Sequence, residues 1–253
     1  WLAGETWRNE VFATHGKIYE ASAAQMFHVP METIKKGSEL RQKGKVAELA
    51  CGYGGGVGAL KAMGADKMGL SDSELQDIIT RWRAKSPRIV RLWSALEEAA
   101  KMAIKTRDTV RIRQGITMSA TDDFLRVFLP SGRCLYYAEP TVEPVAKFGR
   151  FIDTVTYMGV NQATNKWERQ DTYGGKLTEN VVQAIARDCL GEAMRRVDHR
   201  GFQIVAHVHD EIIIDGPRGI LGKVNEIMAE PIDWAPGLRL RGDGYETEYY
   251  RKD

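Results

Sequence analysis

Two adjacent carboxylates stand between two apolar runs near residue 210, and this feature constrains the chain most. Residues 202–208 alternate, and residues 212–214 form a short, β-branched apolar run. Two such runs separated by a polar pair predict a β-hairpin. Its turn would hold Asp210 and Glu211, and a carboxylate placed there is costly unless it meets a cation. The matching cation is a hard divalent metal such as Mg²⁺, which binds carboxylates and phosphates together. A solvated acidic turn is the alternative for this stretch taken alone.

The composition sets wide limits on the rest of the chain. Its 253 residues allow one large domain or two packed subdomains, and 43% hydrophobic content is ample for a core. Three widely spaced cysteines argue against a disulfide framework or a zinc site and indicate a reducing compartment. We find no apolar run near the roughly 20 residues that span a membrane and no signal-peptide pattern at the start. A membrane partner is therefore not expected.

The net charge of +2 does not identify a partner, so local basic clusters matter more. Each cluster could face phosphates, and each could equally be a solvated helix face. They are Arg41, Lys43 and Lys45; Arg81, Arg83, Lys85, Arg88 and Arg91; and Arg195, Arg196, His199 and Arg200.

The stretch that begins at Glu39 is predicted to be a helix that Ser38 can cap. Successive i+4 steps on a helix rotate by about 40°, so every fourth residue from position 41 falls on one slanting stripe. The α-helical stripe consists of Arg41, Lys45, Leu49 and Tyr53. Its two cations suit the phosphates of a nucleoside triphosphate, and its apolar and aromatic residues suit the sugar and base. The alternative is an amphipathic helix with a basic edge and a glycine stop.

The glycine run that follows also fits a loose dinucleotide-binding pattern, G-x-G-x-x-A, from Gly54 to Ala59. That fingerprint must follow a strand, whereas the preceding residues are helix-like. The acidic residue expected about 20 positions later would be Asp72 or Glu74, and these belong to a capping-box pattern that starts at Ser71. We therefore disfavour a dinucleotide-binding fold.

The remaining segments predict an α+β fold. Helices are expected over 17–29, 71–85, 88–105 and about 220–229, together with a long helix that Thr178 caps. The expected strands are Thr109–Ile112, Phe124–Leu129, Cys134–Tyr137 and Phe151–Tyr157, with a strand-like end from Leu238 to Tyr250.

Two motifs, taken together and in order, resemble those of the family A DNA polymerases, the DNA polymerase I type. Arg41-x3-Lys45-x7-Tyr53-Gly54 matches motif B of that family, and residues 208–211, Val-His-Asp-Glu, match its motif C. Residues 129–137 and 172–188 are similar to the bacteriophage branch. The resemblance covers nearly the whole chain.

The resemblance implies the subdomains. A fingers subdomain would occupy residues 1–172, helical to about residue 105 and then β-rich. A palm subdomain would occupy residues 173–253 and would carry an antiparallel sheet with a metal-binding hairpin.

The resemblance also implies two-metal nucleotidyl transfer from a dNTP to a primer 3′-hydroxyl, with Mg²⁺ as cofactor and a DNA primer-template as partner. Asp210 would bind the metals directly, with Glu211 as a second-rank ligand. Arg41 and Lys45 would hold the triphosphate, and Lys45 would protonate the departing pyrophosphate.

The resemblance also assigns roles to four further positions, and two of them, Leu49 and Tyr19, depart from the family. Tyr53 and Gly54 would lie beside the nascent base pair and template. Leu49 stands where many members carry Phe or Tyr, so it can contact the ribose but cannot stack. Tyr19 stands where bacterial members usually have a phosphate-binding histidine.

Two residues of the expected palm subdomain would contact DNA. Gln183 falls where the family places a glutamine near the minor groove of the primer-template, and His209 belongs to motif C itself.

The family needs a second metal-binding aspartate, in motif A, which would lie just before Trp1. Asp243 is the substitute we considered, and nothing in its spacing supports that role. We therefore expect a fingers-plus-palm portion that needs an upstream segment or a separate chain to supply motif A, acting in the host cytoplasm if it is a phage protein. The alternatives are a non-catalytic nucleic-acid-binding module and a relative of single-subunit RNA polymerases, although Glu211 favours DNA synthesis.

Overall fold

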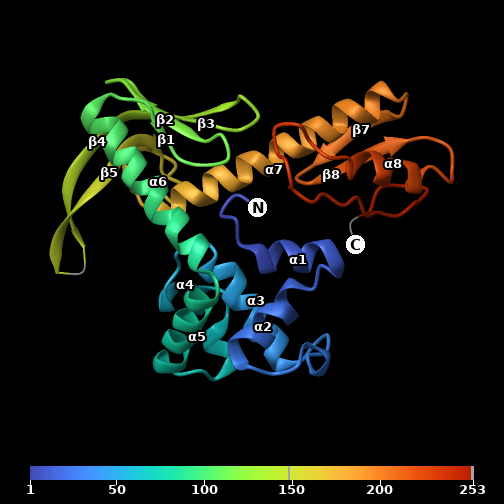
Figure 1. Cartoon of the computed structure of the whole chain (residues 1–253), viewed down its shortest axis with the longest axis horizontal. Coiled ribbons are helices and arrows are strands. Elements are labelled where there is room, and N and C mark those ends of the chain that lie inside the picture. The colour runs from blue at the N-terminus through green and yellow to red at the C-terminus, as the bar shows by residue number, and fades with distance from the viewer. Residues whose placement is uncertain (148, 252–253) are drawn as a thin grey trace. The chain divides into compact units, whose positions relative to one another are not determined.

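The computed structural model describes residues 1–147 and 149–251, apart from the side chain of Asp66. It contains two compact units (Figure 1). Unit 1 comprises Trp1–Phe128 and Cys134–Val181, and unit 2 comprises Leu129–Arg133 and the described residues from Val182 onward. Each unit is described by itself.

Unit 1 begins with helices whose ends follow local signals. Ser38 caps one helix by accepting a hydrogen bond from the Arg41 backbone N–H (3.3 Å), and Ser71 and Glu74 form the predicted capping box. Pro87 occupies the first turn of the next helix, where its missing N–H costs nothing. The helices are α1 (Thr6–Thr14), α2 (Ile18–Phe27), η1 (Met31–Thr33), α3 (Glu39–Cys51), α4 (Val57–Ala62), η2 (Ala65–Met68), α5 (Asp72–Lys85) and α6 (Pro87–Thr106).

The helical core of unit 1 is built around two tryptophans. Trp82 of α5 and Trp93 of α6 stack with parallel rings, 6.1 Å between centroids. The predicted apolar face of α5, which includes Leu75 and Ile79, is buried in the same cluster as Val46 of α3. On the opposite face of α3, Lys45 is partly exposed and Leu49 is exposed.

An antiparallel sheet follows the helices in unit 1, and its strands pair in chain order. Helix α6 covers one face of this sheet (Figure 1). The sequence predicted four strands here but missed β2 and β6, because one is only four residues long and the other is mostly charged and polar. The strands are β1 (Val110–Arg111), β2 (Thr117–Ala120), β3 (Phe124–Phe128), β4 (Cys134–Lys147), β5 (Arg150–Val160) and β6 (Trp167–Thr172).

The long helix α7 (Gly174–His199) starts in unit 1 and continues through unit 2. The prediction that Thr178 caps this helix is wrong. Its hydroxyl donates a hydrogen bond to the Gly174 carbonyl (2.7 Å) within the first turn. The Gly174 N–H is instead satisfied by the Glu97 carboxylate of α6 (2.9 Å).

Unit 2 packs a hairpin, β7 (Gln203–Val208) and β8 (Glu211–Asp215), and α8 (Leu221–Met228) on the end of α7. Ile204, Ile212 and Ile214 of the hairpin lie against a core formed by Val197, Val224 and Ile227. The burial of one hairpin face explains why these strands are apolar.

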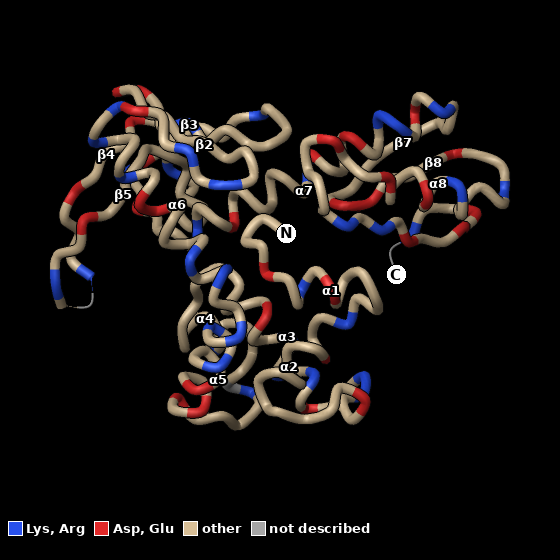
Figure 2. The backbone as a smooth tube through the Cα atoms, viewed as in Figure 1, with Lys and Arg blue, Asp and Glu red and all other residues tan. Residues whose placement is uncertain are grey.

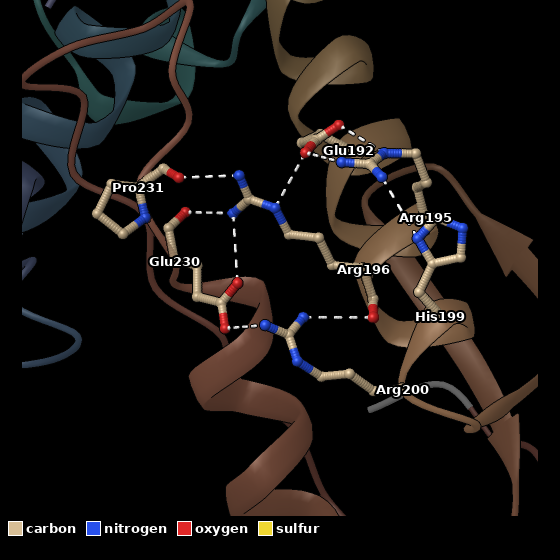
Figure 3. A network of polar contacts seen from close by, with 7 residues as sticks. All are labelled: Glu192, Arg195, Arg196, His199, Arg200, Glu230 and Pro231. Carbon is tan, nitrogen blue, oxygen red and sulfur yellow. Dashed lines mark hydrogen bonds and ion pairs between the residues drawn. The ribbon is translucent and has the colours of Figure 1, made fainter.

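A polar network also fastens α7 to the segment after α8 (Figure 3). Arg196 donates hydrogen bonds to the carboxylate of Glu192 and to the carbonyls of Glu230 and Pro231. The Glu230 carboxylate in turn pairs with Arg200 (2.7 Å). Residues of the third basic cluster are thus engaged with carboxylates.

The predicted strand from Leu238 to Tyr250 is wrong, since no strand forms there in the described residues. This segment lies along α8 instead. Gly242 approaches the Asn225 backbone so closely that a Cβ would lie 2.7 Å from its Cα. Glu246 accepts hydrogen bonds from the N–H groups of Gly219 and Leu221. The carboxylate therefore satisfies backbone donors at the start of α8 in place of a strand ladder.

The structure also shows how charged residues are distributed and that the cysteines are unpaired. Basic and acidic residues are interspersed along both units (Figure 2). The three cysteines are free, and burial raises the pKa of Cys51 to about 12. Among the described residues, no helix combines the length and apolar character that crossing a bilayer requires.

Candidate functional site

The α3 stripe is the first half of the candidate site. Arg41, Lys45 and Leu49 follow one another at four-residue intervals on α3. The first two side chains are partly exposed, and Leu49 is 43% exposed. The three side chains are therefore accessible to a ligand, and their role in nucleotide binding stays a prediction.

A glycine sets the spacing between α3 and α2. A Cβ on Gly44 would lie 2.2 Å from the Tyr19 carbonyl oxygen and 3.0 Å from the Ala23 Cβ. Only glycine allows the two helices to approach this closely. The contact places Tyr19 beside α3, so that the Arg41 guanidinium lies over its ring, 5.4 Å from the centroid.

The two cations of the stripe have different surroundings. Arg41 Nε donates a hydrogen bond to Glu20 Oε1 of α2 (2.7 Å). Within the described part of the chain, no hydrogen bond or ion pair engages the Lys45 ammonium. Arg41 is therefore held in place by a carboxylate, whereas Lys45 is free to meet an anion.

Glu20 is the residue at this site that sequence reasoning missed. Burial acts to raise the pKa of its carboxyl, but hydrogen bonds from Arg41 and from its own backbone, with the charges of Arg41 and Lys17, outweigh burial and lower the pKa below its usual value. The ion pair joins residues that are 21 positions apart. Helical spacing and motif patterns therefore could not predict it.

The lowered pKa of Glu20 makes its ion pair dependent on pH. A carboxyl with a depressed folded-state pKa adds stability above its unfolded-state pKa of about 4.3, and this is lost as pH falls through the lower folded-state pKa. We expect Glu20→Gln to reduce the free energy of unfolding by about 1 kcal/mol at pH 7 and by much less at pH 3. Urea unfolding at both pH values measures this difference. The exposed Glu32 provides the control, Glu32→Gln, and an equal Glu20→Gln effect at both pH values would contradict the assignment.

The glycine of the Tyr53-Gly54 pair in motif B ends helix α3. Gly54 has a φ of 82°, and the N–H groups of Gly54 and Gly55 donate to the carbonyls of Cys51 and Ala50. These two bonds close the helix as a Schellman motif. Arg83 of α5 donates to the Gly54 and Gly55 carbonyls. The glycine run thus ends a helix, which excludes the strand-first arrangement of a dinucleotide-binding fingerprint.

Tyr53 lies at this turn, against the first residues of α7 in unit 1. A Cβ on Gly175 would lie 2.0 Å from the Tyr53 carbonyl oxygen, and one on Gly174 would lie 2.0 Å from the Trp93 carbonyl oxygen. Burial raises the pKa of the Tyr53 hydroxyl, and the Glu179 carboxylate raises it further. The hydroxyl therefore stays protonated at neutral pH.

The predicted hairpin is the second half of the candidate site. Strands β7 and β8 pair as expected, but the turn consists of His209 and Asp210, because Glu211 already pairs with Val208 in the ladder. The prediction of two carboxylates within the turn is therefore wrong by one residue. His209 adopts a φ of 53°, a left-handed conformation that favours glycine. Such strain is often kept at functional positions.

The turn exposes oxygen donors without completing a metal site. Asp210 is exposed and Glu211 is partly exposed, and carboxylate oxygens are the donors that Mg²⁺ prefers. Among residues 1–147 and 149–251, no cluster of three or more metal-binding side chains occurs. The two carboxylates are chemically suited to a divalent metal, and metal binding by the hairpin stays a prediction.

The candidate residues fall into two groups. Unit 1 contains Arg41, Lys45 and Leu49 on α3, Tyr53 and Gly54 in the turn after α3, and Tyr19 on α2. The prediction that Tyr53 continues the helical stripe is wrong, because α3 ends at Cys51. Unit 2 contains Gln183 of α7 and the motif C residues. Gln183 is exposed on α7. The separate roles of these side chains remain predictions.

Comparison with known proteins finds a phage protein that is similar in sequence to the whole of this chain. The chain matches no family model. Over 255 aligned residues it is 55% identical to the DNA polymerase of Bacillus phage SP02, an alignment that includes all of this chain and 39% of that protein. The predicted resemblance to phage DNA polymerases is confirmed. The chain therefore corresponds to well under half the length of the relative that it matches.

A solved structure shows the same fold. The POL domain of Pol1 from M. smegmatis, solved in complex with a DNA primer-template and dNTP, matches 94% of this chain with a TM-score of 0.58 and 17% identity. The match spans 34% of that chain. At this identity the similarity establishes a shared fold, and it confirms the predicted mixture of helices and antiparallel sheet.

Proposed function

We propose that this chain carries the nucleotide-binding residues, and part of the metal-binding residues, of a template-directed DNA polymerase. The observation that carries this proposal is the α3 stripe, in which the unpaired Lys45 lies one turn from Arg41 and one turn from the exposed Leu49. The name of the phage relative supports DNA synthesis, and the solved neighbour was bound to primer-template and dNTP.

In this proposal Arg41 and Lys45 bind the triphosphate in different ways. Arg41 exchanges its bond with Glu20 for phosphate oxygens, which its planar guanidinium can bind in pairs. Lys45 binds the triphosphate as a point charge and gives a proton to the departing pyrophosphate oxygen. General acid catalysis of this kind is typically worth about 100- to 10,000-fold in rate.

The rest of the stripe would hold the sugar and base. Leu49 contacts the ribose, and Tyr53 with Gly54 lies beside the nascent base pair. Tyr19 steadies the Arg41 guanidinium by lying beneath it. Because the Tyr53 hydroxyl keeps its proton, its ring meets the base without adding a negative charge.

The hairpin would contribute to the chemistry at the primer end. Asp210 is proposed to hold Mg²⁺ directly, with Glu211 as an outer ligand. When bound, Mg²⁺ lowers the pKa of the primer 3′-hydroxyl and neutralises the triphosphate. Gln183 and His209 are proposed to contact the primer-template.

A two-metal site needs carboxylates from more than one strand. We therefore propose that an upstream polymerase segment, or a separate chain, supplies a further aspartate beside Asp210. The phage relative extends well beyond the aligned region, which is consistent with such a contribution.

Nucleotide binding by the chain with Mg²⁺ tests this function. We expect Lys45→Ala to weaken the binding of a fluorescent dNTP about tenfold or more, because a charge-assisted bond to a phosphate is lost. Lys43→Ala is the matched control, since Lys43 lies on the same helix but is paired with Glu39 (2.6 Å). Equal losses in the two variants would overturn the assignment of the stripe. Preference for ribonucleotides over deoxyribonucleotides would instead favour a relative of single-subunit RNA polymerases.

A further inference from the structure

Among the described residues of unit 1, the first strands of the sheet carry partly or fully exposed side chains on one face. Leu125, Val127 and Tyr137 point to the buried face, where α6 packs. Residues directly opposite one another in antiparallel strands share a face, so the register defines the other side. We call this side the outer face, and its residues on β1–β3 and at the start of β4 are Arg111, Thr117, Ser119, Phe124, Arg126, Phe128, Cys134 and Tyr136.

The centre of the outer face combines aromatic rings with a cation. Ser119, Arg126 and Tyr136 stand in one row across three strands. The rings of Phe124 and Tyr136 meet edge to face, with 5.8 Å between centroids. Tyr136 is 62% exposed and Phe124 is 38% exposed. Large rings this open on a sheet are typical of a binding surface rather than of a core.

The charge on the outer face is positive and unbalanced. Arg111 and Arg126 make no hydrogen bond or ion pair with any side chain or backbone group that the structure describes. The outer-face positions of β1–β3 contain no carboxylate. Nearby Asp122 is already paired with Arg107 (2.5 Å). Arg111 and Arg126 therefore have no carboxylate partner among the described residues.

We propose that the outer face binds single-stranded nucleic acid, with bases on Tyr136 and Phe124 and phosphates on Arg126 and Arg111. Unpaired bases stack on exposed aromatic rings whatever their sequence, and a basic surface follows the backbone. Duplex bases are already stacked, so their faces are closed to these rings. This binding goes beyond the proposed polymerase chemistry and does not depend on it, because none of these residues belongs to the α3 stripe or to the hairpin.

Fluorescence anisotropy with the whole chain and a labelled oligothymidylate of roughly 15 nucleotides tests the proposal. We expect Tyr136→Ala to weaken binding about tenfold and Tyr136→Phe to retain it, because the ring rather than the hydroxyl stacks. Arg126→Gln is expected to weaken binding and to reduce the slope of log affinity against log salt by about one.

Two variants provide matched controls. Phe151→Ala removes a ring that is 76% exposed on the same sheet but outside the outer face, and Arg91→Gln removes an exposed arginine of α6. Both should bind like the parent chain. Unchanged binding in Tyr136→Ala, equal losses in the controls, or equal competition by a duplex would each overturn the proposal. Because Tyr136→Ala should bind dNTP normally, failure here is distinct from failure of the proposed polymerase function.

Discussion

Asp210→Asn is expected to lower primer extension about 100- to 1,000-fold, the scale at which removing one preorganised electrostatic group acts on a developing charge. The measurement is single-turnover incorporation of one dNTP with Mg²⁺, by this chain supplied with an upstream polymerase segment. Asparagine keeps the size of the side chain and is tolerated in turns, so the hairpin should survive. The loss would then report the charge of the carboxylate.

Asp215→Asn is the matched control, because Asp215 lies at the other end of the same hairpin, opposite Gln203. It should extend primers at the parent rate. A small effect of Asp210→Asn, or an equal effect of the two variants, would remove Asp210 from the catalytic centre. Robust extension by the parent chain alone would show that no upstream carboxylate is required.

Features of the candidate site that depend on local signals could be predicted from the sequence. The cap at Ser38 and the stop at Gly54 bound α3, because each satisfies backbone groups within a few residues. The apolar runs on either side of residue 210 likewise specify the hairpin. Four-residue spacing then places Arg41, Lys45 and Leu49 on one stripe without any tertiary information.

Features that depend on distant parts of the chain could not be predicted. The Glu20–Arg41 pair and the close approach at Gly44 arise from the packing of α2 on α3. The turn was misplaced by one residue because only the ladder shows that Glu211 pairs with Val208. The last segment alternates like a strand, yet Glu246 binds backbone donors of α8 instead. In each case a tertiary partner overrides the local pattern.

The ion pair that joins α3 to α1 predicts a large effect on stability. Glu48 accepts two hydrogen bonds from Arg8 of α1 (2.5 and 2.9 Å) and one from Trp82 Nε1 (2.9 Å). The side chains of Arg8 and Glu48 are each only 11% exposed. We expect Glu48→Ala to lower the free energy of unfolding by about 3–5 kcal/mol, because it leaves a guanidinium buried without its counter-charge. Urea unfolding followed by tryptophan fluorescence measures the loss.

Burial, rather than distance, should decide the size of this effect. The exposed pair Arg107–Asp122 has the same 2.5 Å separation, but its side chains are 44% and 93% exposed, so Asp122→Ala should cost less than about 1 kcal/mol. The double variant Arg8→Met, Glu48→Gln removes both charges and keeps an acceptor for the Trp82 N–H, so it should recover much of the loss. If the double variant is as unstable as Glu48→Ala, or if Asp122→Ala costs as much, the unpaired guanidinium is not the cause. Since Glu48 and the stripe share α3, recovery of dNTP binding in the double variant would further show that the ion pair supports the nucleotide-binding face by holding the helix in place.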